Sequence, residues 1–312
     1  MADVKKIATR QAYGEFLAEY GAERKDLIAM SADLSGSNKT DIFEKAFPER
    51  FIETGISEQD MYAEAAGIAH SGHVVAASTF AMFAAGRSYE IIRNSIAHTH
   101  ANVKVCATHG GITVGEDGAS HQTFEDLALM RVIPGMTVIN PADAASTKIL
   151  LRKEFEKDGP AYIRLGRAGI PVIYAEDADL EIGKGALLKD GSDVAIIATG
   201  LMVTYALEAA EALAAEGISA RVIDMHTIKP LDEEIIIKAA SECKGIVTAE
   251  EHSVIGGLGG AVAEVTSASC PCRVCMVGQQ DVFGESGTPA ELLKKYGMTA
   301  DDIVAAAKSL VK

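Results

Sequence analysis

Basic side chains are scarce in this sequence, and no segment concentrates them. Lysine and arginine together number 29 against 44 aspartates and glutamates among 312 residues, which gives a formal net charge of −15. A surface of this sign repels the phosphate backbone of nucleic acids unless a basic patch is kept apart from it. We therefore expect no nucleic-acid partner.

Cysteine is also scarce, with five residues in the whole chain. An odd count at this low density argues against a disulfide framework and favours reduced, buried thiols. Cys270, Cys272 and Cys275 lie close together in the sequence, but a zinc site of four ligands would need a further residue from a distant segment. Because this cluster lies in an apolar, strand-like run, we expect no metal site in the chain.

Long uninterrupted apolar segments are missing as well. The longest segment without Asp, Glu, Lys or Arg, residues 65–86, contains polar residues such as His70 and Ser78, and it predicts a buried helix, turn and strand rather than a membrane span. Residues 1–6 lead into an amphipathic pattern without an apolar signal region. With 48% hydrophobic and 23% charged residues, the composition is typical of a well-packed soluble protein, which we expect to be cytoplasmic and without a membrane partner.

Short β-branched runs alternate with longer helical patterns along the whole chain. This alternation predicts an α/β fold with doubly wound, mostly parallel sheets. At about 150 residues per domain, the length predicts two consecutive domains. The segment around 171–185 carries Pro171 and an acidic run at 176–179, and it holds no helical or strand period, so it is the best linker. We therefore place the first domain at residues 1–170 and the second at 186–312.

The individual elements follow from the same periodicities. Strands are expected at 27–30, 73–77, 103–108, 137–139, 161–165, 194–199, 220–223, 245–249 and 273–277. Helices are expected at 5–20, 58–70, 81–97, 122–130, 142–157, 204–216, 232–242, 258–267 and 299–310.

Polar segments follow several of these strands, at residues 31–38, 54–59, 78–80 and 108–121. Ligands of open parallel sheets bind at the carboxyl ends of the strands, so these segments are candidate site residues. Each one alone is also explained as a helix cap, a core aromatic or a surface loop. Their recurrence at successive strand ends favours a binding site.

Three kinds of side chain in these segments suggest chemistry. Glu58 begins a helix of small and apolar residues, where a buried carboxyl could share a proton with a ligand nitrogen. Phe80 and Phe83 could form a flat wall for a heterocycle, although such pairs are often simply core. His109 and His121, with Asp117 between them, could act as acid/base groups in a polar pocket.

Six segments occur in a characteristic order, namely Ser-Ala-Asp-Leu-Ser-Gly-Ser-Asn (31–38), Thr-Gly-Ile-Ser-Glu-Gln (54–59), Ser-Thr-Phe-Ala-Met-Phe (78–83), Ala-Thr-His-Gly-Gly (107–111), Val-Gly-Glu-Asp-Gly-Ala-Ser-His-Gln (114–122) and Asn-Pro-Ala-Asp (140–143). This order closely resembles the pyrimidine-binding domain of transketolases. The similarity continues through residues 164–167, 250–259 and 281–289, so it covers nearly the whole chain. It implies a pyrimidine-binding domain followed by a transketolase C-terminal domain.

One feature of full-length transketolases is missing. Those proteins also carry an N-terminal domain with a Gly-Asp-Gly motif and a distant Asn, which hold the metal ion and diphosphate of thiamine diphosphate; this sequence contains neither Gly-Asp-Gly nor an Asn-Asn pair. The chain therefore resembles the C-terminal subunit of a split transketolase. The resemblance implies two copies of this chain with two copies of a Gly-Asp-Gly partner, which would bind Mg²⁺ or Ca²⁺. It also implies sugar phosphates as substrates, as in the pentose phosphate pathway.

The resemblance also assigns roles to individual residues. Glu58 matches the glutamate that hydrogen-bonds N1′ of the aminopyrimidine, and His121 matches a histidine near the reacting carbon. Residues that contact the cofactor or lie close to it are Phe83, Phe80 and Asp33. Residues that match substrate contacts are Asp117 for the sugar hydroxyls and Arg10, Ser37, His109 and Arg167 for the phosphate.

The sequence departs from the family pattern at Gln59 and Gly86, where members often carry a histidine and a third aromatic residue. Two other readings therefore remain. The first is a β-type subunit of another thiamine diphosphate enzyme, such as a 2-oxoacid dehydrogenase or a deoxyxylulose phosphate synthase-like protein. The second is a non-catalytic assembly partner. The set of His109, Asp117 and His121, together with the four phosphate-contacting residues, favours a transketolase subunit that transfers a two-carbon ketol unit from a ketose phosphate to an aldose phosphate. The presence of Glu58 and Phe83 counts against a non-catalytic partner.

Overall fold

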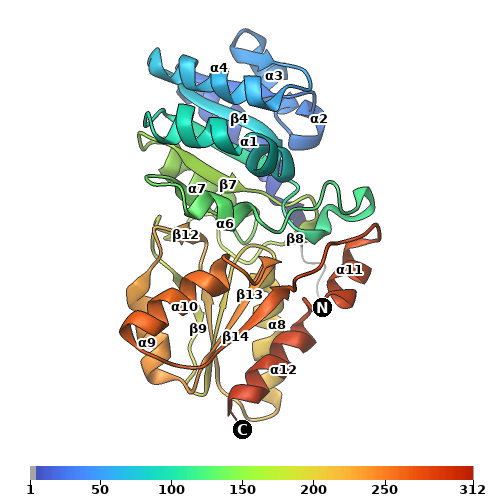
Figure 1. Cartoon of the computed structure of the whole chain (residues 1–312), viewed down its shortest axis with the longest axis vertical. Helices are drawn as coiled ribbons and strands as arrows, with labels where there is room; N and C mark the ends of the chain where they lie inside the picture. The colour runs from blue at the N-terminus through green and yellow to red at the C-terminus, as the bar shows by residue number, and fades with distance from the viewer. Residues whose placement is uncertain (1–4, 312) are drawn as a thin grey trace.

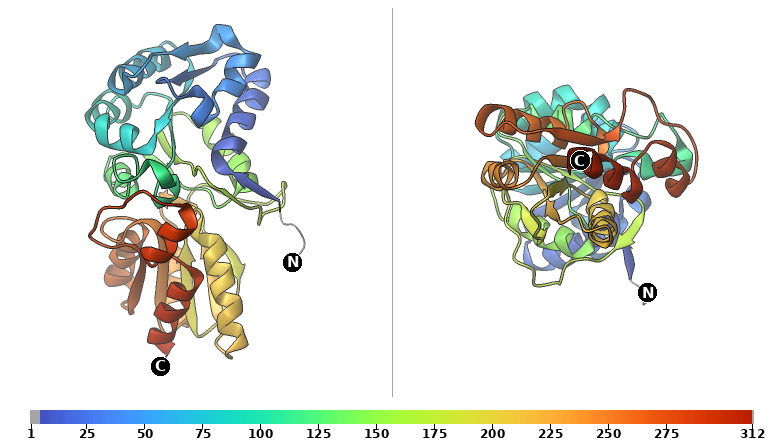
Figure 2. Two further views of the ribbon diagram at one scale, coloured as in Figure 1. Left: turned by 90° about the vertical axis from the view of Figure 1, so that its right-hand side faces the viewer. Right: turned by 90° about the horizontal axis from the view of Figure 1, so that it is seen from below.

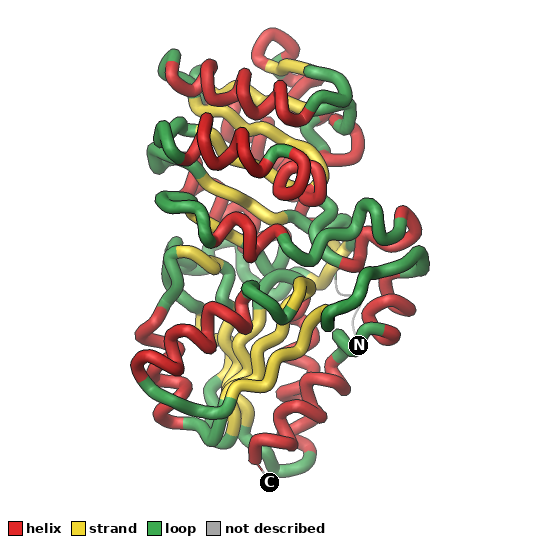
Figure 3. Tube along the Cα trace, viewed as in Figure 1, coloured by secondary structure: helices red, strands yellow, loops and turns green. Residues whose placement is uncertain are grey.

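The computed structural model describes residues 5–311, which form two α/β units, one above the other in Figure 1. Each unit is built around one sheet with helices on both of its faces, as Figure 3 shows most clearly for the lower unit. The doubly wound α/β architecture predicted from the sequence is confirmed. Figure 2 shows the two units from the side, with the C-terminus at the far end of the lower one.

The upper sheet has seven strands in the order β12-β6-β7-β5-β4-β2-β3. Every neighbouring pair is parallel except β12 with β6. Because β12 belongs to the second half of the chain, the two units share this sheet. The strands are β2 (Leu27–Ser31), β3 (Phe51–Glu53), β4 (Val74–Phe80), β5 (Val103–Thr108), β6 (Thr137–Ile139), β7 (Ala161–Arg164) and β12 (Thr227–Lys229).

Helices cover both faces of the upper sheet because alternate strand residues point to opposite faces. In β4, Val74 and Ala76 pack with helices α1 (Thr9–Glu23) and α7 (Ala144–Phe155), whereas Val75 and Ala77 pack with α4 (Glu58–His70). Aromatic contacts join α1 to α7, with the rings of Phe16 and Phe155 centred 5.2 Å apart. Burial on both faces explains why these strands read as continuous apolar runs.

The lower sheet has five strands in the order β14-β13-β10-β11-β9, and only β9 is antiparallel to its neighbour. Helices α8 (Met202–Ala215) and α12 (Ala300–Val311) pack on one face, and α9 (Glu233–Glu242) and α10 (Leu258–Ser269) pack on the other. The strands are β9 (Ala186–Lys189), β10 (Val194–Ala198), β11 (Ala220–Asp224), β13 (Ile246–Ser253) and β14 (Val274–Gln279).

One apolar cluster runs through both units. It contains Val105 of β5, Met130 of α6 (Asp126–Arg131), Ile228 of β12 and Ile197 of β10, all buried. The upper and lower sheets are therefore not independent cores joined by a tether.

Shorter elements complete the upper unit, and some differ from expectation. The segment 81–97, expected as one helix, forms two π-helical turns, η2 (Met82–Arg87) and η3 (Ile92–Ala97), on either side of α5 (Tyr89–Ile91). Apolar periodicity does not distinguish these wider turns from α-helical ones, and such turns are frequent at functional sites. Other short elements are α2 (Ser35–Asn38), α3 (Asp41–Ala46), η1 (Pro48–Arg50), η4 (Ile112–Asp117) and α11 (Pro289–Lys295).

The expected linker is attached to both units. Strand β8 (Gly169–Pro171) pairs antiparallel with β1 (Lys6–Ala8), and no helix or strand follows it until residue 186. The backbone N–H groups of Ile173 and Tyr174 donate to Asp143 Oδ2, and the Tyr174 hydroxyl donates to Asp224 Oδ2 at 2.8 Å. The division of the chain at residues 170 and 186 remains a sequence-based prediction.

The cysteines are all unpaired in the described part of the chain, but only Cys106 and Cys243 are buried. Cys270, Cys272 and Cys275 are half-buried, so the expectation of uniformly buried thiols is wrong for these three. The reason is that β14 is an edge strand, which leaves this part of the chain partly uncovered. Residues 5–311 contain no helix that is both long and apolar enough to cross a membrane.

A buried ion pair of the upper unit is also hydrogen-bonded to the lower unit. Arg164 of β7 donates to both carboxylate oxygens of Asp126 in α6, at 2.7 and 3.2 Å, and to the backbone carbonyl of Glu251 in β13 at 2.9 Å. Tyr162 donates its hydroxyl to the same carboxylate at 2.8 Å. A buried charge left without its partner is strongly destabilising.

We therefore expect Arg164→Met to lower the free energy of unfolding by about 3–5 kcal/mol, because it strands the Asp126 carboxylate in the interior. The matched control is Lys45→Met, which removes an exposed ion pair with Asp41 and should cost less than about 1 kcal/mol. Urea unfolding followed by circular dichroism measures both. Similar losses for the two variants would contradict the role given to Arg164.

Candidate active site

The candidate residues gather at the carboxyl ends of the strands of the upper sheet. Phe80 is the last residue of β4, His109 directly follows β5, and Glu58 is the first residue of α4. Parallel strands end at the same edge, so side chains far apart in the sequence meet there. The expectation that the strand-end segments lie together therefore holds for these three.

Four rings form a contiguous group, which we call the aromatic cluster: Phe80, Phe83, His109 and His121. Phe80 stacks on His109 with ring centroids 3.8 Å apart, and it lies 6.0 Å from Phe83. His121 meets the edge of Phe83 at 5.4 Å. Phe80 and His109 are buried, while Phe83 and His121 are half-buried, so the cluster has an inner and an outer side.

His109 is held as a neutral imidazole. Its Nε2 lies 3.2 Å from Nη1 of Arg10, and because a guanidinium only donates, Nε2 must accept. The proton is then on Nδ1, which donates to Thr108 Oγ1 at 2.9 Å. Burial, together with the nearby Arg10 and Arg167 charges, lowers the pKa of His109 to about 3. His109 therefore serves as a hydrogen-bonding group at neutral pH and not as the acid/base group that the sequence allowed.

Two arginines lie near His109. Arg10 of α1 donates to the backbone carbonyl of Ser37 at 2.7 Å. Ser37 therefore contacts Arg10 through its backbone oxygen and not through its hydroxyl. Arg167, which follows β7, donates to the carbonyl of Val114 and to Glu116 Oε2 at 2.9 Å. Burial and the charge of Arg167 lower the pKa of Arg10. The structure thus gathers positive charge at one place on a strongly acidic protein.

Glu58 lies on the other side of Phe83. Its side chain is 2% exposed, and its Oε2 accepts a hydrogen bond of 2.6 Å from Nη1 of Arg87. The Arg87 guanidinium also lies over the Phe83 ring, 4.6 Å from the centroid. Sequence reasoning missed Arg87, although it is the first charged residue after the long uncharged segment and lies four positions after Phe83.

Two of the expected site residues lie outside this group. Asp33 is exposed with a φ of 56°, and its backbone N–H donates to Glu53 Oε1 at 2.6 Å. Asp117 ends η4 and is exposed. Within residues 5–311, neither carboxylate makes a hydrogen bond to the aromatic cluster or to the arginines. The side chain of His121 lies 3.0 Å from Ser120 Oγ through its Nδ1.

The lower unit holds the loop that carries His109, Asp117 and His121. Glu251 Oε1 accepts from the backbone N–H of Thr113 at 2.6 Å, and Gln122 donates to the carbonyl of Glu285 at 2.9 Å. Gly111 has a φ of 87°, and a Cβ there would lie 2.4 Å from the Glu251 carboxyl, so only glycine fits. Segments 250–259 and 281–289 belong to the family resemblance, which gave them no role in the site. In the structure, Glu251 and Glu285 of these segments hold the loop in place.

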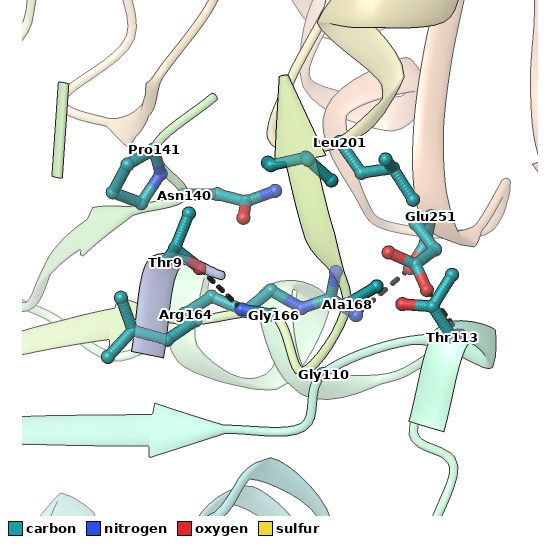
Figure 4. A pocket seen from close by; sticks show the side chains of 12 residues that line it. Thr9, Gly110, Thr113, Asn140, Pro141, Arg164, Gly166, Ala168, Leu201 and Glu251 are labelled. Atoms are coloured by element: carbon teal, nitrogen blue, oxygen red, sulfur yellow. Dashed lines mark hydrogen bonds between the residues drawn. The ribbon is translucent and has the colours of Figure 1, made fainter. Parts of the chain in front are cut away.

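A small cavity lies behind this loop, between the two units. Its volume is about 20 Å³, which accommodates no more than a water molecule or so. Figure 4 shows its lining from both units, with Thr9, Gly110 and Asn140 of the upper unit and Leu201 and Glu251 of the lower one. This cavity is too small for a cofactor.

Comparisons with known proteins match both units. Residues 5–171 match the family model described as transketolase, pyrimidine binding domain, and residues 183–303 match transketolase, C-terminal domain. The chain is 52% identical over 297 residues to a putative transketolase C-terminal section of Methanocaldococcus jannaschii, covering 94% of this chain and 93% of that protein. It is 40% identical to a 6-deoxy-6-sulfo-D-fructose transketolase subunit of a Clostridium species, strain MSTE9, covering 97% and 94%.

Solved structures agree with these matches. One described as a split gene transketolase, inactive beta4 tetramer, superposes with a TM-score of 0.92 and is 55% identical, with 98% of each chain covered. The similarity in fold therefore extends over both units and their relative placement.

We expect the His109 imidazole to stay neutral from pH 8 down to pH 5, because its pKa of about 3 lies well below the ordinary value of about 6.5. The folded state then binds fewer protons than the unfolded chain, so this group stabilises the fold above about pH 6.5, and that contribution is lost as the pH falls toward 3. Nitrogen-15 chemical shifts of histidine-labelled protein, assigned with His109→Gln, report both the charge and the Nδ1–H tautomer. A titration midpoint near 6.5 would refute the assignment.

Proposed function

Because the chain belongs to the transketolase family, we propose that it acts as the C-terminal subunit of a split, thiamine diphosphate-dependent transketolase. In this role it transfers a two-carbon ketol unit from a ketose phosphate to an aldose phosphate, together with an N-terminal partner chain. The observation that carries the proposal is the full-length match to relatives that are themselves C-terminal sections or subunits. The matches to the pyrimidine-binding and C-terminal domains cover residues 5–171 and 183–303.

The donor set around Glu58 fits the pyrimidine end of thiamine diphosphate. A buried carboxylate beside the face of Phe83 suits a flat heterocycle that carries an N–H donor. We assign Glu58 to accept the hydrogen bond of N1′ and to hold a proton there, with Phe83 and Phe80 packing at the ring. Thiamine diphosphate, when bound, supplies the electron sink for the transfer. We assign its diphosphate and Mg²⁺ or Ca²⁺ to the partner chain, because this sequence lacks Gly-Asp-Gly.

The substrate end of the site is assigned to the group around His109. Arg10 and Arg167 are permanent charges and suit a phosphate, with Ser37 and His109 as neutral neighbours. Asp117 is exposed and free to meet sugar hydroxyls, and His121 lies beside Phe83 on the outer side of the cluster, near where the reacting carbon would lie. One relative is named for a sulfonated sugar, and a sulfonate offers arginine the same kind of anionic oxygens as a phosphate.

Exposed residues around Glu58 support a partner at this edge of the sheet. Ile56 lies two positions before Glu58 and is 77% exposed, which is unusual for so large an apolar side chain beside a site. Asp33 lies on the neighbouring loop and is also exposed. We assign both to an interface in an assembly of two copies of this chain and two partner chains, which we expect in the cytoplasm.

The purified chain alone should show no ketol transfer, because it lacks the ligands that fix the diphosphate and metal. Addition of a transketolase chain that carries Gly-Asp-Gly should restore turnover, measured with a coupled aldose phosphate assay. The matched control is Glu58→Gln in the same mixture, which should remain inactive because an amide cannot supply the proton. Robust activity of this chain without a partner would refute the split-enzyme assignment.

Arg167→Ala should raise KM for phosphorylated acceptors by about 10- to 150-fold with kcat little changed, because the phosphate is held similarly before and during the reaction. Steady-state kinetics of the two-chain complex measures this, with a non-phosphorylated aldehyde as the comparison substrate. Glu116→Gln is the control, since it removes only the carboxylate that pairs with Arg167. If both kinds of acceptor lost affinity equally, Arg167 would have a structural role instead.

A further inference from the structure

Arg87 covers both of the surfaces that the proposed function assigns to the aminopyrimidine. Its Nη1 donates to Glu58 Oε2 at 2.6 Å, and its guanidinium carbon lies 4.6 Å from the centre of the Phe83 ring. Glu58 is almost completely buried, whereas the Arg87 side chain is 45% exposed. One cation from the chain thus satisfies the carboxylate and stacks on the aromatic ring at the same time.

The Arg87 guanidinium and a protonated aminopyrimidine would be bound through the same kinds of contact. A guanidinium is a flat cation that donates N–H groups in its plane and stacks on aromatic faces. An aminopyrimidine that is protonated at N1′ is likewise flat, positively charged and an in-plane N–H donor. Both therefore require the carboxylate of Glu58 and the face of Phe83.

The free subunit has a physical need for such a counter-ion. A carboxylate as buried as that of Glu58 is strongly destabilising when nothing neutralises it. In the described part of the chain, Arg87 is the single side chain that forms an ion pair with Glu58, and Glu58 is the single ion-pair partner of Arg87. Removal of either side chain leaves the other without an ion-pair partner in the described part of the chain.

We propose that Arg87 is a placeholder for the aminopyrimidine, which neutralises Glu58 in the free subunit and leaves when thiamine diphosphate binds. The inference rests on the proposed function and adds a competing contact to it. Cofactor binding then exchanges one cation for another at Glu58, so the carboxylate is paired in both states. The cofactor must also displace Arg87, and part of its binding energy is used for that step.

The local backbone is suited to this exchange. Arg87 ends the π-helical turn η2 and directly follows Gly86. Because its side chain is 45% exposed, the guanidinium can turn toward solvent and become hydrated. Glu58, at the buried start of α4, stays in place and presents the same carboxylate to either partner.

The decisive variant is Arg87→Met, which keeps an apolar stem beside Phe83 and removes the charge. Calorimetric titration of thiamine diphosphate, at saturating Mg²⁺, into the complex of this chain with a Gly-Asp-Gly partner measures cofactor affinity without relying on activity. We expect Kd to fall by about tenfold, equivalent to about 1.4 kcal/mol, because no ion pair has to be broken. The melting temperature of the free subunit should fall by several degrees, because Glu58 loses its counter-ion.

Two further variants complete the test. Arg87→Lys keeps a charge that pairs with Glu58 but stacks less well than a guanidinium, so it should shift both quantities in the same directions by smaller amounts, and it replaces Arg87→Met if that variant fails to fold. Arg93→Met is the matched control, because Arg93 is an exposed arginine nearby in the chain whose guanidinium bonds to the adjacent Asn94. It should change neither Kd nor the melting temperature.

The direction of the change in Kd for thiamine diphosphate tests the placeholder role of Arg87. If Arg87→Met weakened cofactor binding, or left Kd unchanged, then Arg87 would remain on Glu58 in the complex and the placeholder role would be overturned while the proposed function stood. If the wild-type complex bound no thiamine diphosphate, the proposed function itself would fail, and this inference with it.

Discussion

The buried guanidinium of Arg164 is the contact on which the two units and the site depend. Burial opposes its charge, but Asp126 and Glu251 hold the pKa of Arg164 above its usual value, so it is a permanent cation inside the protein. Asp126 belongs to the upper unit and Glu251 to the lower one. Arg164 therefore has a partner in each unit, and together with strand β12 and the shared apolar cluster it fixes how the units are oriented.

The loop between β5 and α6, which carries His109 and His121, is held in place by the same contacts. Glu251 bonds Thr113 through its carboxylate and Arg164 through its backbone carbonyl, so the loop between β5 and α6 is fixed by a residue of the lower unit. His109 lies at the start of this loop with a φ of 59°, a left-handed conformation that is uncommon for a residue other than glycine. The C-terminal unit therefore acts as a support for the site, even though the aromatic cluster and its arginines all come from the upper unit.

The charges of the site are arranged in two separate groups. Arg10 and Arg167 lie by His109, which is neutral, and Arg87 lies by Glu58 across the aromatic cluster. In the first group Arg10 has no carboxylate partner among the described residues and Arg167 pairs with the exposed Glu116, whereas in the second group Arg87 pairs with the buried Glu58. This separation suits the two molecules of the proposed function, a substrate with an anionic group beside His109 and a cofactor with a flat, N–H-bearing ring beside Glu58.

The sequence by itself determined the order of the main strands and helices, the family and the motifs that supply the candidate site, because repeated apolar patterns and ordered motifs are local properties of the chain. Strands β4, β5, β10 and β11 and helix α4 were all expected where they occur. It did not reveal β12, which pairs with a strand from the other half of the chain, or β1 and β8, which are three residues each and pair only with each other. Short strands of this kind exist through long-range hydrogen bonds and carry no period of their own.

Tertiary structure alone decided which atoms meet. The neutral state of His109 follows from its burial and from the approach of Arg10, which lies 99 positions away along the chain. The counter-ion of Glu58 is Arg87, 29 positions away. The segment 81–97 was expected as one helix, and its two π-helical turns appear only in the folded structure. Protonation state and ion pairing depend on distance and burial in three dimensions, which the order of residues along a chain does not contain.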